Sequence, residues 1–309
     1  MYKKGCILVS ILLTITLFAG LSLPARAQTQ SVEGKVDWEK GIIIVEGFGA
    51  PPEDASGAQE KLLAQRAAKA DAYRNAVEYI EGVRVDSETE VEDYVVESDE
   101  IKTQVEGFVK HGEFVTIEYD SDNACRVELE LPLGGQEGLS SFFEKKVRED
   151  SSDEPAEDID EHVDREETEE EPEEKPEEEP EEDDEERVID DEKDYTSVIV
   201  DVRGYDLEPA MYPQIFDTDG NRLYGPAVID AENPENLPTL AAYARSEDKA
   251  EEIDRAGSNP LLIEATGVID REDETPTDAI INSENAELFK EIDKTNDIVN
   301  KRAIIFIID

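Results

Sequence analysis

The sequence predicts an α/β protein of two small domains, each a mixed sheet with one or two packed helices, joined by a disordered acidic linker. Three observations support this prediction. Residues 57–81 carry apolar side chains at helical spacing, between segments whose residues alternate between apolar and polar, as in strands. Residues 149–194 hold 29 acidic and 4 basic residues and few apolar ones. Residues 303–308 are apolar on both faces, which is typical of an interior strand covered from both sides.

The first 27 residues have the parts of an export signal. Lys3 and Lys4 precede the apolar core Ile7–Leu23, and Ala25-Arg26-Ala27 forms a small-x-small cleavage site. We expect cleavage between Ala27 and Gln28, a periplasmic or other extracytoplasmic location, and no transmembrane segment in the mature chain. The alternative is an uncleaved membrane anchor, because the apolar core is nearly as long as a spanning helix.

Residues 28–148 are expected to form the first domain around a long helix from Gly57 to Glu81. Its predicted packing face consists of Leu63, Ala67, Ala70, Val77 and Ile80. Gly82 is expected to end the helix in a left-handed conformation, and a strand is expected over residues 83–91, where valines alternate with charged residues. Asp71 and Arg74 lie three residues apart on the helix and are expected to pair.

The other elements of the first domain surround this helix. A hairpin is predicted over residues 31–48, and a short helix begins after Ser98. Two more strands are predicted near residues 109–119 and 125–131, the second with Cys125 on its inward face. We interpret Cys125 as a buried, inert thiol; the alternative is a redox or intermolecular role.

Residues 195–309 are expected to form the second domain. The predicted elements are a strand over 197–202, a hairpin of 213–216 and 222–224, strands over 261–268 and 279–281, a helix over 284–295 capped by Ser283, and the interior strand 303–308.

Residues 149–194 are expected to form a solvated spacer that is extended by the mutual repulsion of its charges; the alternative is diffuse binding of cations. The whole chain has a formal net charge of −51, and both flanking domains are also acidic. Such a surface repels nucleic acid and anionic lipid, so we expect neither as a partner. An acidic excess of this kind also suits a high-salt habitat.

Motifs that carry chemistry are few. Gly47-x-Gly49 lacks the third glycine of a dinucleotide site and is followed by two prolines, so we reject that interpretation. Residues 217–221 begin like a calcium loop, but Arg222 and Val228 stand where that loop needs glycine and glutamate. His111 is expected on a surface turn, and the other histidine, His162, lies in the predicted linker. A serine or cysteine nucleophile in either domain would therefore have no histidine as its paired base. We therefore expect no enzymatic activity, no cofactor and no metal site. The alternative is chemistry by carboxylates alone, as in glycosidases, although a single tryptophan suits a sugar cleft poorly.

Several motifs resemble a known family. They are Gly47–Pro52, Ala67–Arg74, Ile80–Val85, Val105–Lys110 and Cys125–Leu129. In this order they resemble the Lpp-twenty lipoprotein family and the N-terminal domain of the flagellar assembly protein T, over residues 36–133. The positions that carry the structural signature are Gly49, Ala67, Asp71, Ala72, Arg74, Gly82 and Gly107. Residues 200–205, 209–213 and 259–262 resemble a C-terminal domain found beside it in exported bacterial proteins. Unlike the lipoproteins, this chain has no cysteine placed for lipidation.

The resemblance implies a small α/β envelope domain with a non-enzymatic role, which some members have at the flagellar basal body. Two functions remain open at this point. One is an exported structural or assembly protein of the cell envelope, with envelope or flagellar proteins as partners. The other is a soluble extracytoplasmic binding protein for a small ligand or cations.

Overall fold

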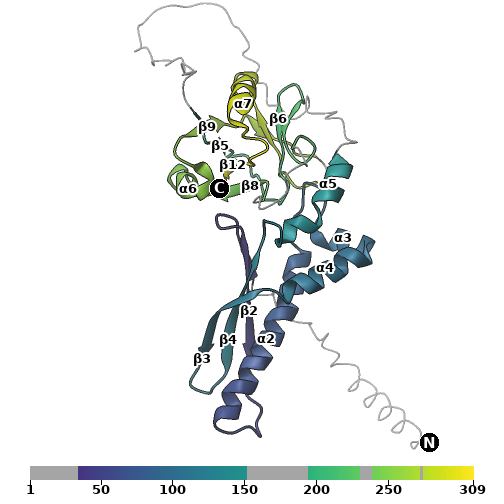
Figure 1. Ribbon diagram of the computed structural model, residues 1–309, viewed down its shortest axis with the longest axis vertical. Coiled ribbons are helices and arrows are strands. Elements are labelled where there is room, and N and C mark those ends of the chain that lie inside the picture. Colours follow the sequence, from purple (N-terminus) through teal and green to yellow (C-terminus); the bar gives the residue numbers. More distant parts are fainter. Residues whose placement is uncertain (1–33, 152–193, 230–238, 272–273) are drawn as a thin grey trace, which may run out of the picture. The chain divides into compact units, whose positions relative to one another are not determined.

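The computed structural model describes residues 34–151, 194–229, 239–271 and 274–309 (Figure 1). It confirms the predicted α/β class, with one sheet in residues 34–151 and two sheets in residues 194–309. We call these parts the first and the second domain. The predicted cleavage site, Ala27 and Gln28, and residues 152–193 of the predicted linker lie outside the described residues.

The sheet of the first domain is antiparallel throughout, not mixed. Its strands are β1 (Gly34–Asp37), β2 (Ile42–Gly49), β3 (Glu113–Tyr119) and β4 (Cys125–Pro132), in the order β1-β2-β4-β3. Alternate residues of β4 are buried, namely Cys125, Val127, Leu129 and Leu131. The predicted inward face of this strand, with its buried thiol, is therefore confirmed.

Helix α2 (Ala58–Glu81) packs along this sheet and is the long helix that the sequence predicts (Figure 1). Its buried residues are Ala64, Ala68, Ala72, Ala76 and Ile80, at steps of four. Of the predicted face, Ile80 is confirmed as buried, but the rest was wrong by about one position: Ala67 and Ala70 are exposed, and Leu63 and Val77 are only partly buried. The prediction followed the larger apolar side chains of the helix. The buried face instead consists mostly of alanines, because little space separates the helix from the strand opposite it.

That strand is β2, and two of its glycines allow the helix to come close. A Cβ atom at Gly49 would lie 2.2 Å from the backbone oxygen of Ala64, and one at Gly47 would lie 2.3 Å from that of Ala68. No side chain fits in this space. The Gly47-x-Gly49 motif therefore has a packing role between a strand and an alanine stripe.

The strand predicted over residues 83–91 is absent. Gly82 has φ of −88°, which is not left-handed, and its N–H bonds to the oxygen of Tyr79 at 3.2 Å. A loop follows in which Asp86 Oδ1 accepts hydrogen bonds from the backbone and the hydroxyl of Thr89, at 2.9 and 2.7 Å. Local side-chain bonds of this kind compete with strand pairing. Only one bridge, Arg84 to Glu90, remains of the predicted strand.

Helices complete the first domain. Helix α3 (Val91–Glu97) follows the loop, and α4 (Asp99–Val109) begins after Ser98, whose Oγ accepts from the N–H of Ile101 at 3.3 Å, as predicted. Helix α3, the short helix η1 (Leu139–Phe142) and helix α5 (Glu144–Ser151) have no counterpart among the elements predicted from the sequence. Because α5 extends to Ser151, the first three residues of the predicted linker are helical.

The second domain contains two sheets, where one was predicted. A parallel sheet has the order β8-β12-β5-β9, from β8 (Ala241–Ala244), β12 (Ile304–Ile307), β5 (Ser197–Asp201) and β9 (Pro260–Glu264). The other sheet has the order β10-β11-β6-β7, from β10 (Gly267–Val268), β11 (Ala279–Ile281), β6 (Ile215–Asp217) and β7 (Arg222–Tyr224). The single strand predicted over residues 261–268 is thus divided between the sheets.

Three helical segments accompany these sheets: α6 (Glu247–Glu252), η3 (Asp254–Ala256) and α7 (Ser283–Asn296). The cap of α7 is Asn282 and not Ser283, since Asn282 Oδ1 accepts from the N–H of Asn285 at 2.8 Å. Strand β12 is buried on both faces, as predicted. Ile304 and Phe306 belong to the main core, whereas Ile305 and Ile307 pack with Ala250 of α6 and Ala256 of η3.

The two domains share one core. Residues 33–309 form a single compact unit, and the main apolar cluster contains residues of both domains. The rings of Trp38 and Tyr243 meet edge to face with their centres 5.3 Å apart, and the N–H of Tyr212 bonds to the oxygen of Val85 at 2.9 Å. The buried guanidinium of Arg302 pairs with Glu144 at 2.5 Å.

Candidate functional site

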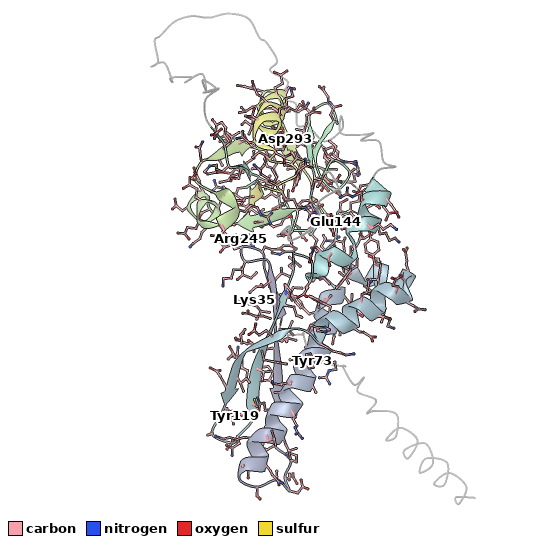
Figure 2. The ribbon with its side chains drawn as sticks, in the orientation of Figure 1. Lys35, Tyr73, Tyr119, Glu144, Arg245 and Asp293 are labelled. Carbon is pink, nitrogen blue, oxygen red and sulfur yellow. The ribbon has the colours of Figure 1, made fainter. Side chains whose placement is uncertain are left out.

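Strand β3 forms one edge of the sheet of the first domain, and no strand in the described parts of the chain pairs with its outer side. Three large apolar residues of this strand are exposed: Val115 by 47%, Ile117 by 41% and Tyr119 by 38%. Tyr119 lies at the end of the strand (Figure 2). Unpaired backbone groups beside exposed apolar side chains form a template for another strand.

Two lysines of α2 lie against the aromatic rings of this strand. Lys61 Nζ is 5.2 Å from the centre of the Tyr119 ring, and Lys69 Nζ is 4.3 Å from that of Phe114. Neither lysine forms an ion pair within the described residues. The strand edge is therefore bordered by unpaired positive charge, in a chain whose net charge is −51. We call Val115, Ile117, Tyr119, Lys61 and Lys69 the β3 edge surface.

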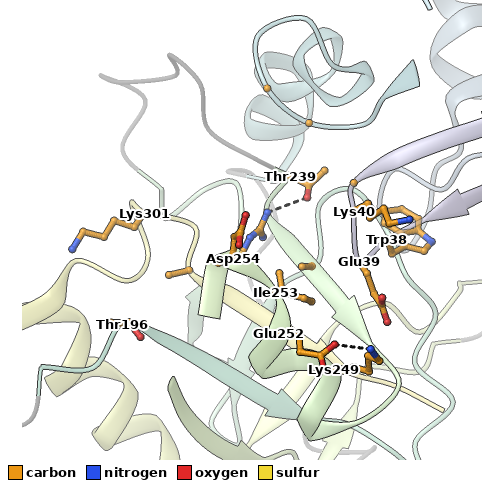
Figure 3. Close-up of a pocket in the computed structure, with 16 residues that line it drawn as sticks. Trp38, Glu39, Lys40, Thr196, Thr239, Lys249, Glu252, Ile253, Asp254 and Lys301 are labelled. Atoms are coloured by element: carbon orange, nitrogen blue, oxygen red, sulfur yellow. Dashed lines mark hydrogen bonds and ion pairs between the residues drawn. The ribbon is translucent and has the colours of Figure 1, made fainter. Parts of the chain in front are cut away.

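A groove of about 940 Å³ is the second candidate (Figure 3). One wall is the turn between β1 and β2, from Trp38 to Gly41. The other comes from the second domain, where Thr196, Thr239 and Ala303 precede the parallel strands β5, β8 and β12. The groove thus lies at the amino ends of the parallel strands, whereas cofactors of open α/β sheets bind at the carboxyl ends.

Among the cations that line the groove, Arg255 is partly buried and bonds to the backbone. Arg255 Nη1 donates to the backbone oxygens of Leu240 and Ile304, at 3.1 and 3.3 Å. Its Nη2 donates to Thr239 Oγ1 at 3.3 Å, the bond drawn as a dashed line at Thr239 in Figure 3. Burial lowers the pKa of Arg255 to about 10. None of the described residues lining the groove is histidine, cysteine or serine, so the groove offers no nucleophile with a paired base.

The predicted signature residues do not form a pocket. Most of them lie where α2 packs on β2: Ala72 is buried, and Asp71 Oδ2 accepts from the N–H of Phe48 at 3.0 Å. The predicted pair of Asp71 with Arg74 is present. Gly107 lies in α4 and has open space where a Cβ atom would be, so the structure gives it no packing role. Together these residues define a helix–sheet contact.

Neither the described cysteine nor the described histidine supplies a reactive group to the two candidates, although Cys125 lies on β4 directly opposite Tyr119 of the β3 edge surface. Cys125 is buried, and burial raises the pKa of its thiol. His111 is exposed on a turn, where its Nδ1 contacts the oxygen of Gly107 at 2.8 Å. Among the described residues, no three His, Cys, Asp or Glu side chains gather in a way that could hold a metal ion.

Neither candidate site was predicted from the sequence. The sequence pattern identifies β3 as a strand, but it does not say which strand lies at the edge, because sheet order depends on long-range pairing. Arg255 follows a stretch with no strong periodicity. The sequence signal that could have indicated Arg255 is its position between the apolar residues Ile253 and Ala256, just before the turn residue Gly257.

In the described parts of the chain, no helix combines the length and the apolar composition that crossing a membrane requires.

Comparison with known proteins gives one family match. Residues 197–309 match the family described as Treponema pallidum Tp0624, second domain. The match begins at the first residue of β5 and covers the whole second domain from there. No match to the Lpp-twenty family or to flagellar assembly protein T accompanies it, so that resemblance of the first domain stays a prediction. None of the curated proteins matches the chain.

Proposed function

We propose that this protein is an exported, non-enzymatic assembly protein of the cell envelope that binds a partner protein through the β3 edge surface. The observation that carries the proposal is the open edge of β3 with its exposed Val115, Ile117 and Tyr119. An extended peptide can add to such an edge, where backbone hydrogen bonds supply affinity and alternate side chains supply specificity.

The chemistry of the surface indicates the kind of partner. Its apolar side chains fit a strand with apolar residues at alternate positions. The ammonium groups of Lys61 and Lys69 have no carboxylate partner in the described residues, so an acidic residue on the incoming strand would complement them. A second copy is a poor occupant, because two chains that each carry a net charge of −51 repel one another.

The place of action follows from the sequence. The export signal that ends at Ala27 puts the partner outside the cytoplasm, and the resemblance of residues 36–133 favours an envelope or flagellar basal-body protein. Mass spectrometry of the protein purified from its own cells is expected to find Gln28 at the N-terminus. An N-terminus at Met1 would contradict export by cleavage.

Crosslinking in intact cells tests the partner surface. A photo-crosslinking amino acid at position 113, on the exposed start of β3, is expected to give an adduct with a different protein. Val115→Lys should abolish this adduct, because it puts a charge on the apolar edge. Val96→Lys is the matched control: Val96 is 79% exposed but lies on α3. An adduct that survives Val115→Lys, or one formed by two copies of this chain, would overturn the proposal.

A further inference from the structure

The groove at the amino ends of β5, β8 and β12 holds a cation without a counter-ion. Arg255 is partly buried, and all three of its hydrogen-bond acceptors are neutral oxygens. No carboxylate of the described residues forms an ion pair with it, and the nearby guanidinium of Arg302 adds to the positive charge. A cation removed from water without an anion is unfavourable, so the site is suited to an anion from solution.

The hydrogen bonds of Arg255 leave part of the guanidinium available. A guanidinium carries five N–H groups. Three N–H groups point to Leu240 O, Ile304 O and Thr239 Oγ1. The Nε–H and one Nη2–H have no acceptor in the described parts of the chain. Two N–H groups on one guanidinium match the two oxygens of a carboxylate or phosphate.

The surroundings of Arg255 fit a small organic anion. Lys40, Lys249 and Lys301 also line the groove, against Glu39, Glu252 and Asp254, so that its basic side chains outnumber its acidic ones. The whole chain has the opposite balance, with 30 basic and 81 acidic residues. Apolar surface is supplied by Trp38, Ala242 and Ile253. A volume of about 940 Å³ is within the range of small-molecule sites.

We propose that this groove binds a small organic anion whose carboxylate or phosphate group is held by Arg255. The apolar body of the anion lies against Trp38 on the turn of the first domain. Because the walls come from both domains, binding would stabilise their contact. The site is independent of the β3 edge surface, and the loss of either one leaves the other intact.

The chain provides its own reporter for this site. Trp38 is its single tryptophan and lines the groove, so its fluorescence reports occupancy. The mature full-length protein is titrated with inorganic phosphate and, separately, with succinate, at constant ionic strength set with sodium chloride. A saturable change of Trp38 fluorescence with one of the two anions is expected, and the anion that acts tells a phosphate from a carboxylate ligand.

Three variants make the test specific. Arg255→Gln is expected to weaken binding at least tenfold. Arg255→Lys keeps the charge but loses the paired N–H groups of the guanidinium (the fork), so it is expected to weaken binding. Its urea midpoint is expected to stay close to that of the wild type. Arg66→Gln removes one exposed arginine of α2 and should bind like the wild type. If Arg255→Gln does not fold, Arg255→Lys alone decides.

Two results would overturn the proposal. One is the absence of a saturable fluorescence change with both anions up to about 10 mM, which is tenfold above a millimolar dissociation constant. The other is equal affinity in the wild type and in a folded Arg255→Lys variant, which would mean that the anion does not use the fork. The Val115→Lys variant, which is expected to lose the β3 crosslink, should give the same fluorescence titration as the wild type.

Discussion

The carboxylate of Asp71 accepts a hydrogen bond from the backbone N–H of Phe48, 3.0 Å away. Four residues further along α2, Asn75 Nδ2 donates to the backbone oxygen of Glu46 at 3.0 Å. In the described chain, β1 pairs with β2 only over residues 42–45, so these two side chains bind the part of β2 that β1 does not reach. Asp71 thus takes the place of a neighbouring strand, which is a structural task.

Replacing Asp71 tests this interpretation. Asp71→Ala is expected to lower the free energy of unfolding by about 1 kcal/mol, because the N–H of Phe48 loses its acceptor. Asp71→Asn keeps an acceptor oxygen and should be milder. Arg74→Ala should have little effect, since its side chain is 72% exposed. Urea denaturation measures all three. A fully stable Asp71→Asn variant that has lost its partner crosslink would instead assign Asp71 a direct role in binding.

The close approach of α2 to β2 predicts an unequal response to two glycine substitutions. Gly49→Ala is expected to destabilise the protein by about 1–3 kcal/mol, because its Cβ would lie 2.2 Å from the backbone oxygen of Ala64. Gly107→Ala adds the same methyl group in a helix with open space, and should be neutral or stabilising by up to about 1 kcal/mol. Thermal melting of both variants makes the comparison. A tolerated Gly49→Ala would contradict the packing explanation of the glycine motif.

Elements with strong local signals were predictable from the sequence. Alternating residues identify β4, a helix-length alanine-rich segment identifies α2, and Ser98 marks the start of α4. The buried stripe of α2 was not predictable, because the choice between Ala67 and Ala68 depends on the glycines of a strand some twenty residues earlier. The alternation over residues 83–91 was misleading, because Asp86 closes a loop there by local hydrogen bonds.

The candidate sites were less predictable than the fold. Exposure of Val115 and Ile117 follows from the position of β3 at the sheet edge, and the groove needs residues from both domains. Sequence spacing encodes neither relationship. The sequence does indicate that basic residues are rare in this chain, since acids outnumber bases by 81 to 30. A basic residue without an acidic partner is therefore unusual.

A buried acid of the second domain predicts a pH-dependent stability. Burial raises the pKa of Asp278 to about 6 from its ordinary value of 3.8, although Asp278 accepts hydrogen bonds from Gln214 and Thr277. The negative charge of Asp86 acts in the same direction. The folded state therefore binds more protons than the unfolded state between these values. Stability from this group is present at low pH and is lost as the pH rises from about 4 to about 6.

Asp278→Asn isolates this contribution. The variant has no charge to lose, and the buried, unpartnered Oε1 of Gln214 offers an acceptor for its new amide. Relative to the variant, the wild type should lose stability on the order of 2–3 kcal/mol between about pH 4 and pH 6. Urea denaturation over this pH range measures the difference. Asp122→Asn, at an exposed turn, is the control for the change of net charge. Parallel profiles of the wild type and Asp278→Asn would contradict the prediction.

The contact between the domains predicts that they stay together after the segment between them is cut. Arg302 is 4% exposed and pairs with Glu144, and Tyr212 donates its hydroxyl proton to the oxygen of Ser140. A glutamate-specific protease should cut within residues 152–193, where acids are densest, and the two fragments should still elute together from a sizing column. Glu144→Gln should weaken this association, because it removes a carboxylate from a buried guanidinium. Lys145→Gln, whose side chain is 90% exposed, should not. Fragments that separate at once in the wild type would mean that the domains fold and act independently.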